Sequence, residues 1–164
     1  MSKSAILVLL FAILLAGCKK HPEIPCSEFY SVEYYSENEV PPHDDPAVGM
    51  GWLIIDFNDS TAVFSVIISP IDSVTGFHFH AGASGVNGPV IVTLLEIMPP
   101  YNIISRKLLA ARIEFSAADF QGPAAGEPFL YFVNLVRAGE VYSNVHTINH
   151  PPGASRGQIL PFQL

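Results

Sequence analysis

Short segments in which apolar and polar residues alternate constrain the fold of this chain more than any other feature. A period of two places alternate side chains on opposite faces of a strand, so that one face can be buried. Turns rich in glycine and proline separate these segments, which is typical of an antiparallel sandwich or barrel. The expected strands cover residues 30–34, 52–57, 62–68, 74–80, 89–97, 107–115, 141–148 and 157–164. The sequence therefore predicts an all-β fold, an antiparallel β-sandwich of Greek-key type with about eight strands.

One segment, residues 128–138, has the period of a helix. Its apolar residues recur at positions i, i+3, i+4 and i+7, and they are Phe129, Phe132, Val133 and Val136. Pro128 suits a first helical turn and Gly139 suits the position just past the end, which favours one short helix. A strand is the alternative, because aromatic and β-branched residues are frequent in this segment.

The N-terminal segment has the pattern of an export signal. Lys3 precedes an apolar run over residues 5–16, which is too short to cross a bilayer as a helix. The run ends in the tetrapeptide LAGC at Cys18, which resembles the bacterial lipobox. That resemblance implies that residues 1–17 are a lipoprotein signal peptide, and that Cys18 receives diacylglycerol and a further acyl chain such as palmitate. An ordinary secretory signal with a chance cysteine is the alternative.

The remaining 147 residues are expected to form a tether and one domain. Residues 18–27, with two prolines, are predicted to be the lipidated tether, and residues 28–164 the domain. The resemblance to the lipobox implies a membrane anchor in the bacterial cell envelope. Lys19 stands where an aspartate would signal retention in the inner membrane, so the outer membrane or the cell surface is the expected location. Cys26 is left without an intramolecular partner for a disulfide.

The charge distribution argues against nucleic-acid binding. The net charge is −7, and residues 21–105 contain 11 acids and no lysine or arginine. Such a surface repels phosphate. The glycines at Gly82, Gly85 and Gly88 do not lie between a strand and a helix, so nucleotide binding is not expected either.

Two histidines separated by one residue suggest a metal site. His78 and His80 lie on a predicted strand, so both imidazoles leave the same face, about 6–7 Å apart at the backbone. They can therefore converge on one transition-metal ion, copper or zinc. His146 on a later strand would supply a third nitrogen, and His150 in the next loop a fourth. The alternative is structural, with histidines that only hydrogen-bond to loops.

Three stretches in a fixed order resemble the CHRD (chordin-type) domain. They read ENEVPP, then GFHFHAG followed by GVNGPV, and finally YSNVHT followed by PGASRGQ, at residues 37–42, 76–90 and 142–158. The resemblance covers residues 29–164. It implies an extracellular or exported domain with no established reaction, and hence a binding or structural module. Its partner, a protein or a metal ligand, does not follow from the resemblance.

A looser resemblance links the chain to copper/zinc superoxide dismutases. GFHFH is similar to their GFHVH segment, VH to their VVH segment, and GASR to the glycine-rich turn with their active-site arginine. It implies copper ligands at His78, His80 and His146, and an anion-steering role for Arg156. However, no histidine lies between His80 and His146, so the bridging and zinc ligands are missing. A redox enzyme is thus the alternative, and a non-enzymatic module is favoured.

Glu39 and Arg156 lie in the most distinctive of these stretches. An arginine and a carboxylate form a strong pair. We expect Glu39 and Arg156 to pair, or each to cap backbone groups of the other's loop. Asn144 shares a strand face with His146. We assign Asn144, Glu39 and Arg156 together a structural or anion-binding role.

Overall fold

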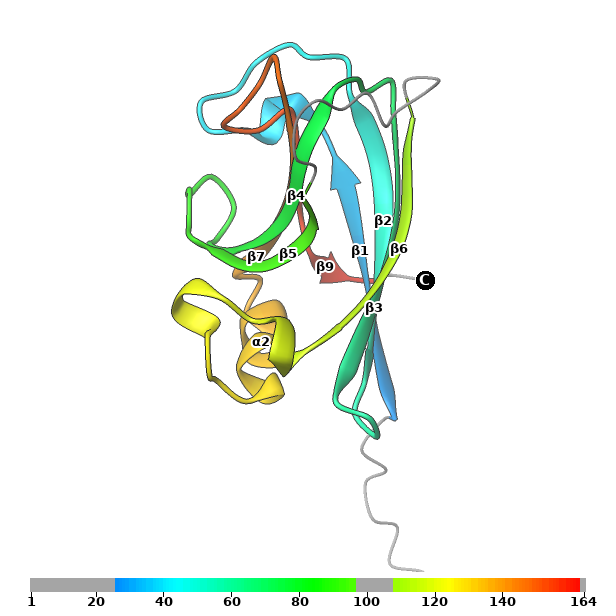
Figure 1. Cartoon of the computed structure of the whole chain (residues 1–164), viewed down its shortest axis with the longest axis vertical. Helices are drawn as coiled ribbons and strands as arrows, with labels where there is room; N and C mark the ends of the chain where they lie inside the picture. The colour runs from blue at the N-terminus through cyan, green and yellow to red at the C-terminus, as the bar shows by residue number, and fades with distance from the viewer. Residues whose placement is uncertain (1–25, 97–107, 163–164) are drawn as a thin grey trace, which may run out of the picture.

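The computed structural model describes residues 26–96 and 108–162, which form two antiparallel sheets facing each other and one α-helix (Figure 1). The predicted signal peptide, Cys18, most of the predicted tether and Lys107 lie outside these residues, so lipidation stays a prediction. Cys26 is exposed and has a free thiol. Within the described ranges, no helix combines the length and apolarity needed to cross a bilayer.

The larger sheet has five strands in the order β6-β3-β2-β1-β9. Their bounds are β1 Ser27–Tyr34, β2 Val48–Asp56, β3 Thr61–Ser69, β6 Leu109–Ser116 and β9 Leu160–Pro161. The smaller sheet has the order β5-β4-β7-β8. Its strands are β4 Val74–Ala81, β5 Val90–Glu96, β7 Val141–Thr147 and β8 Ser155–Gln158. Short 3-10 helices occupy three connections, at Ser36–Asn38, Ala117–Asp119 and Gly122–Ala124.

The predicted all-β sandwich is confirmed, with one change at its C-terminal end. The sequence predicted a single strand over residues 157–164, whereas the chain forms β8 and then β9, in different sheets. Ile159 between them is fully buried, and its backbone N–H donates to the carbonyl of Val141. The chain therefore crosses between the sheets at Ile159, an event that apolar alternation alone does not reveal.

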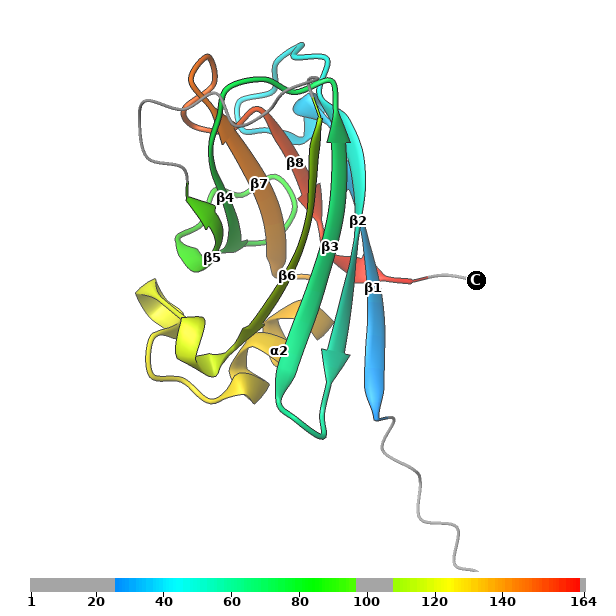
Figure 2. The same cartoon turned by 45° about the vertical axis from the view of Figure 1, so that its right-hand side comes forward.

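The predicted helix is also confirmed, as α2 over Phe129–Arg137. Its four predicted apolar residues are buried, and Gly139, with a φ of 70°, follows its end. Figures 1 and 2 show α2 lying at one end of the sandwich, below the smaller sheet. The strand alternative for this segment is therefore excluded.

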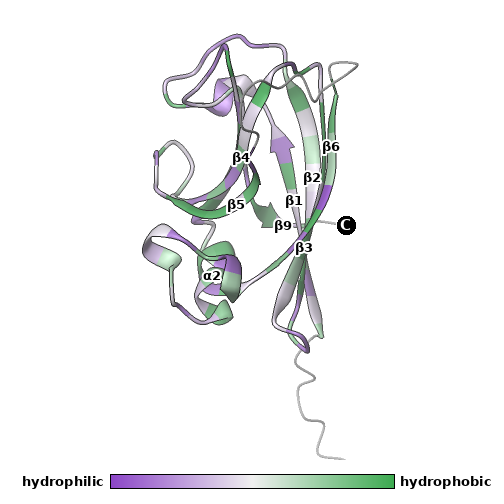
Figure 3. Cartoon of the chain, in the orientation of Figure 1, coloured by the Kyte–Doolittle hydropathy of each residue, from purple (hydrophilic) through white to green (hydrophobic). Residues whose placement is uncertain are grey.

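The core lies between the sheets and is rich in aromatic rings. Phe77 and Phe79 of β4 are fully buried, and the Phe79 ring packs edge-on against Phe64 of β3 at 4.8 Å between centroids. Buried and more exposed residues alternate along β2 and β3, as expected when one face of a sheet is buried. Figure 3 shows that hydrophobic residues are frequent on the strands of both sheets. Because the phenylalanines of β4 point into the core, its histidines must leave the opposite face.

Candidate metal centre

The three histidines lie on the outer face of the smaller sheet, on the neighbouring strands β4 and β7. The cross-strand pairs on this face are Gly76 with His146, His78 with Asn144, and His80 with Tyr142. Two histidines on one strand and one on its neighbour are thus held by the sheet itself. The structure brings His78, His80 and His146 together, as the sequence predicted from their positions.

The three rings converge on a common point. One ligand nitrogen from each histidine lies within 4.8 Å of the other two. Ring centroids are 4.9 Å apart for His78 and His146, and His80 is only 8% exposed. A tetrahedral ion with bonds of about 2.0–2.1 Å holds its ligands about 3.4 Å apart. Small rotations of the rings toward each other would therefore complete a three-nitrogen site.

Backbone carbonyls orient two of the rings. His80 Nδ1 lies 2.9 Å from the carbonyl of Gly88, and His146 Nδ1 lies 2.9 Å from the carbonyl of Pro151. A carbonyl only accepts, so Nδ1 carries the proton and Nε2 keeps its lone pair. Both Nε2 atoms are buried without a hydrogen-bond partner among the described residues, as is Nδ1 of His78. This is the arrangement by which proteins fix the tautomer and direction of a metal-binding histidine.

The electrostatic environment keeps the three rings neutral. Burial lowers the pKa of His78 to about 4, with further lowering by His146 and His80. Burial also lowers the pKa of His80 and of His146, against the raising effect of their carbonyl partners. Only a neutral imidazole binds a metal ion. Protons therefore compete little with a metal ion for the cluster at neutral pH.

Gly76 provides the space that the His78 ring occupies. A Cβ at Gly76 would lie 2.9 Å from Cε1 and 3.4 Å from Nε2 of His78. These separations are shorter than ordinary van der Waals contacts, so a side chain at Gly76 would displace the His78 ring. The glycine of the GFHFH segment thus has a physical role in the cluster.

His150 is held away from the cluster that was predicted to include it. Its ring stacks on His43 at 4.3 Å between centroids, and its Nε2 lies 3.2 Å from a carboxylate oxygen of Asp45. The group of potential ligands found in the described part of the chain contains the other three histidines alone. The structure does not place a fourth nitrogen from His150 near them.

Arg156 is buried and supports the loop over residues 82–89. Its guanidinium donates to the carbonyls of Ala83 and Val86 at 3.3 and 2.6 Å, and to Asn87 Oδ1 at 3.0 Å. It also lies 3.4 Å from the ring centre of Tyr142, onto which the His80 ring stacks at 4.8 Å. Arg156 therefore stabilises the loop that contains Gly88, the residue whose carbonyl orients His80.

The expected direct pair between Glu39 and Arg156 is not formed in the described structure. Oε2 of Glu39 instead accepts from Nδ2 of Asn144 at 3.3 Å. The side chain of Arg156 does not cap the loop of Glu39 either. It caps a different loop, over residues 82–89. In the other direction, Asn38, beside Glu39, donates to the backbone carbonyl of Arg156. Two short segments far apart in sequence are linked through Asn144 and Asn38 in place of an ion pair.

Burial has a strong effect on Glu39, which is 5% exposed. It raises the pKa of Glu39 to about 7, although Arg156, His43 and Asn144 each act to lower it. The raised value means that folding takes up a proton between the ordinary pKa of 4.5 and about 7. The contribution of this carboxyl to stability is therefore present at pH 4 and is lost as the pH rises through 7.

The substitution Glu39→Gln tests this assignment. Glutamine has the same shape and does not titrate, so the variant should gain in free energy of unfolding relative to wild type as the pH rises from 5 to 8. At pH 8 the expected gain is on the order of 1–2 kcal/mol. Urea unfolding of both proteins at pH 5 and pH 8 measures it, with the exposed Glu37→Gln as control. A difference that does not change with pH would contradict the raised pKa.

Some parts of the site had little or no signal in the sequence. The carbonyls of Gly88 and Pro151 act through the backbone, which any residue could supply. Tyr142 lies on the same strand face as His146, two positions from Asn144, and that spacing could have indicated its contact with His80. The contact of Tyr142 with Arg156 depends on the register of β8 against β7, which cannot be predicted from the sequence.

The comparisons with known proteins agree with the resemblance noted in the sequence. The family model described as the CHRD domain matches residues 30–159. Neither the curated proteins nor the solved structures contain a significant match to the chain. The matched region includes all of the smaller sheet, most of the larger sheet except β9, and all three clustered histidines. The chain belongs to the CHRD domain family.

Proposed function

We propose that this CHRD domain binds one transition-metal ion, copper or zinc, through His78, His80 and His146. The observation that carries the proposal is the convergence of three neutral imidazoles, two of them oriented by backbone carbonyls. Buried polar atoms without a partner are uncommon in proteins, because each costs free energy. Metal binding would satisfy the nitrogens left without a partner at this cluster.

The donor set limits the metals that fit. Imidazole nitrogens suit copper and zinc, whereas calcium and magnesium require oxygen ligands. Three protein ligands also leave one position of a tetrahedral ion open to water or to an external donor. Such a site could bind an ion and pass it on to an external donor. A bound ion would also stabilise the surface around the three histidines.

The proposed setting is the bacterial cell envelope, with the domain anchored by lipid at Cys18. The apolar run over residues 5–16 and its LAGC end support this setting. The anchor would hold the metal site close to the outer membrane or cell surface through a short tether.

A superoxide-dismutase-like enzyme would use the same histidines with Arg156 as an anion guide. The donors of Arg156 that would attract an anion are directed to Ala83, Val86 and Asn87, and its face lies on Tyr142. The net charge of the chain is also negative, which slows the approach of an anion. These observations favour a binding module over a redox enzyme.

Metal titration tests the proposal. The soluble form that begins after Cys18 is expected to bind one Cu(I), Cu(II) or Zn(II) ion per chain, as measured by competition with chelators. Removing one of three ligands should weaken this binding by at least about 100-fold in His78→Ala. His43→Ala is the matched control, since His43 is a partly buried histidine outside the cluster and should leave the affinity unchanged.

Two outcomes would overturn the metal proposal. One is the absence of stoichiometric binding of any of these ions, which would leave a domain for protein interaction. The other is equal affinity in wild type and His78→Ala, because the ion would then be bound elsewhere.

A further inference from the structure

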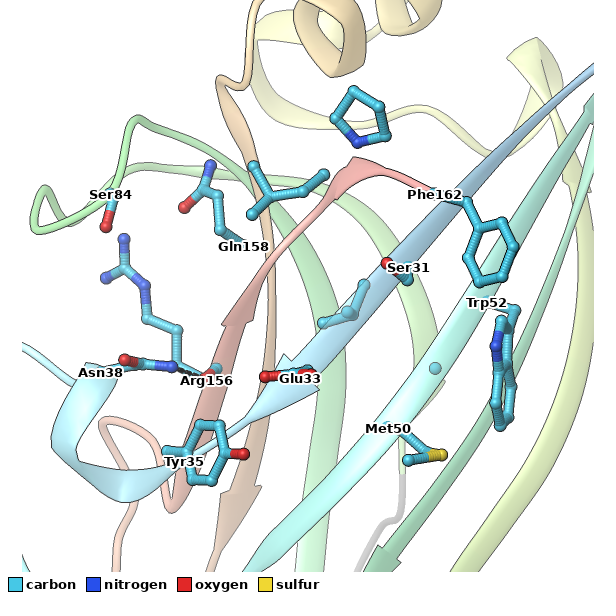
Figure 4. A pocket seen from close by; sticks show the side chains of 14 residues that line it. Ser31, Glu33, Tyr35, Asn38, Met50, Trp52, Ser84, Arg156, Gln158 and Phe162 are labelled. Carbon is cyan, nitrogen blue, oxygen red and sulfur yellow. Dashed lines mark hydrogen bonds between the residues drawn. The ribbon is translucent and has the colours of Figure 1, made fainter. Parts of the chain in front are cut away.

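A groove separate from the histidine cluster lies along the outer side of β1, β2, β8 and β9. Its volume is about 730 Å³, which is within the range of small-molecule sites. None of the three clustered histidines lines it. In Figure 4, Trp52 and Phe162 lie at one side of the groove, Ser31 and Glu33 along its middle, and Ser84 and Gln158 at the other side.

The side of the groove near β2 presents exposed apolar surface. Trp52, Met50 and Phe162 are 41%, 48% and 47% exposed. The backbone explains this exposure, because Trp52 is the cross-strand partner of Ser31 on the face of the sheet away from the core. Large aromatic side chains that are left in water over a concave surface are typical of a binding site.

Polar groups without partners stand beside these rings. The side chains of Ser31, Glu33 and Ser84, and the indole N–H of Trp52, form no hydrogen bond with the residues that the structure describes. Among the described residues that line the groove, Glu33 is the single acidic one and Arg156 the single basic one, and the Arg156 guanidinium is engaged with the 82–89 loop. The groove thus combines aromatic surface, free hydroxyls and one carboxylate, with no free cation.

We propose that this groove binds a neutral oligosaccharide. A pyranose ring has a face of C–H groups that packs on an aromatic ring, and a rim of hydroxyls that both donate and accept hydrogen bonds. Trp52 would contact the C–H face, and Glu33 and Ser31 would bind the hydroxyls. An apolar peptide segment is a poorer occupant, because it would desolvate the Glu33 carboxylate without giving it a partner.

Charge decides between neutral and anionic saccharides. Within the part of the lining that the structure describes, the carboxylate of Glu33 is the only unengaged charge, and the net charge of the chain is −7. Both repel uronate or sulfate groups. The occupant is therefore a neutral glycan, with free hydroxyls and no acidic substituent.

The single tryptophan of the chain makes this proposal directly measurable. Titration of the soluble domain with cellohexaose, maltohexaose, mannohexaose and chitohexaose should change the Trp52 fluorescence saturably for at least one of them. Polygalacturonate, an anionic chain, should give no saturable change. Calorimetry on Trp52→Ala with the sugar that binds should show affinity at least 10-fold lower.

Ile54→Ala is the matched control, because Ile54 lies two residues from Trp52 on the same face, is 38% exposed and does not line the groove. It should bind as wild type does. His78→Ala should also retain binding, which separates this proposal from the metal site. Lack of saturable binding to all four neutral sugars would overturn the proposal. So would equal affinity in Trp52→Ala, or association of the domain with itself through this face that no sugar reverses.

Discussion

Arg156→Met is expected to destabilise the domain by about 2–4 kcal/mol, because it removes hydrogen-bond donors from a loop. Arg156 is only 2% exposed, and its guanidinium donates to Ala83, Val86 and Asn87. Methionine fills a similar volume, yet it leaves the carbonyl of Val86 and Oδ1 of Asn87 without their donor, while Ala83 keeps only the backbone N–H of Val86. It also removes the positive charge that lowers the pKa of the buried Glu39. The free energy of unfolding from urea denaturation, compared at pH 7, measures the loss.

The contrast with a surface arginine shows why burial sets the size of this effect. Arg137 pairs with Glu28 at 2.6 Å, but its side chain is 43% exposed. Arg137→Met should therefore cost no more than about 1 kcal/mol, since exposed ion pairs contribute little. If Arg156→Met also cost less than about 1 kcal/mol, the loop over residues 82–89 would not depend on Arg156, and its assigned role would be wrong.

The fold could be predicted largely from local patterns. Alternation, together with apolar runs that end at turn residues, identified the strands of both sheets. The i, i+3, i+4, i+7 pattern together with Gly139 identified α2. The exception at Ile159 has a clear cause. A residue that is buried where the chain passes from one sheet to the other is as apolar as a residue that is buried within a strand. The sequence pattern therefore does not show where the chain changes sheets.

The part of the candidate site that lies on strands could be predicted from the sequence. The single residue between His78 and His80 places both on one face, and His146 joins them because β7 pairs with β4. His150 and Glu39 were harder, because both lie outside the strands in connections whose paths follow from tertiary contacts. His150 stacks on His43, and Asn144 donates a hydrogen bond to Glu39. Each of these contacts joins segments that are far apart in the sequence, so local patterns do not indicate it.

Gly88→Ala is the second substitution with a large expected effect, because it acts on stability and on the metal site together. A Cβ at Gly88 would lie 1.5 Å from the carbonyl oxygen of Ala81, so the backbone of the loop would have to move. That movement would strain the bonds of Gly88 to Tyr142 and His80. We expect a loss of about 3 kcal/mol in free energy of unfolding and metal affinity about 10–100-fold lower, as when an orienting partner of a ligand is removed.

Gly85→Ala in the same loop separates the collision at Gly88 from the general effect of a side chain there. Gly85 has a φ of 77° and no atom within 4 Å of its Cβ position, so alanine should cost only about 1 kcal/mol, from backbone strain. Metal affinity should then remain that of wild type, because the Gly88 carbonyl keeps its place beside His80. Equal metal affinity in Gly88→Ala and Gly85→Ala would show that His80 needs no carbonyl to orient it. The convergence of the three rings would then follow from the pairing of β4 with β7 alone.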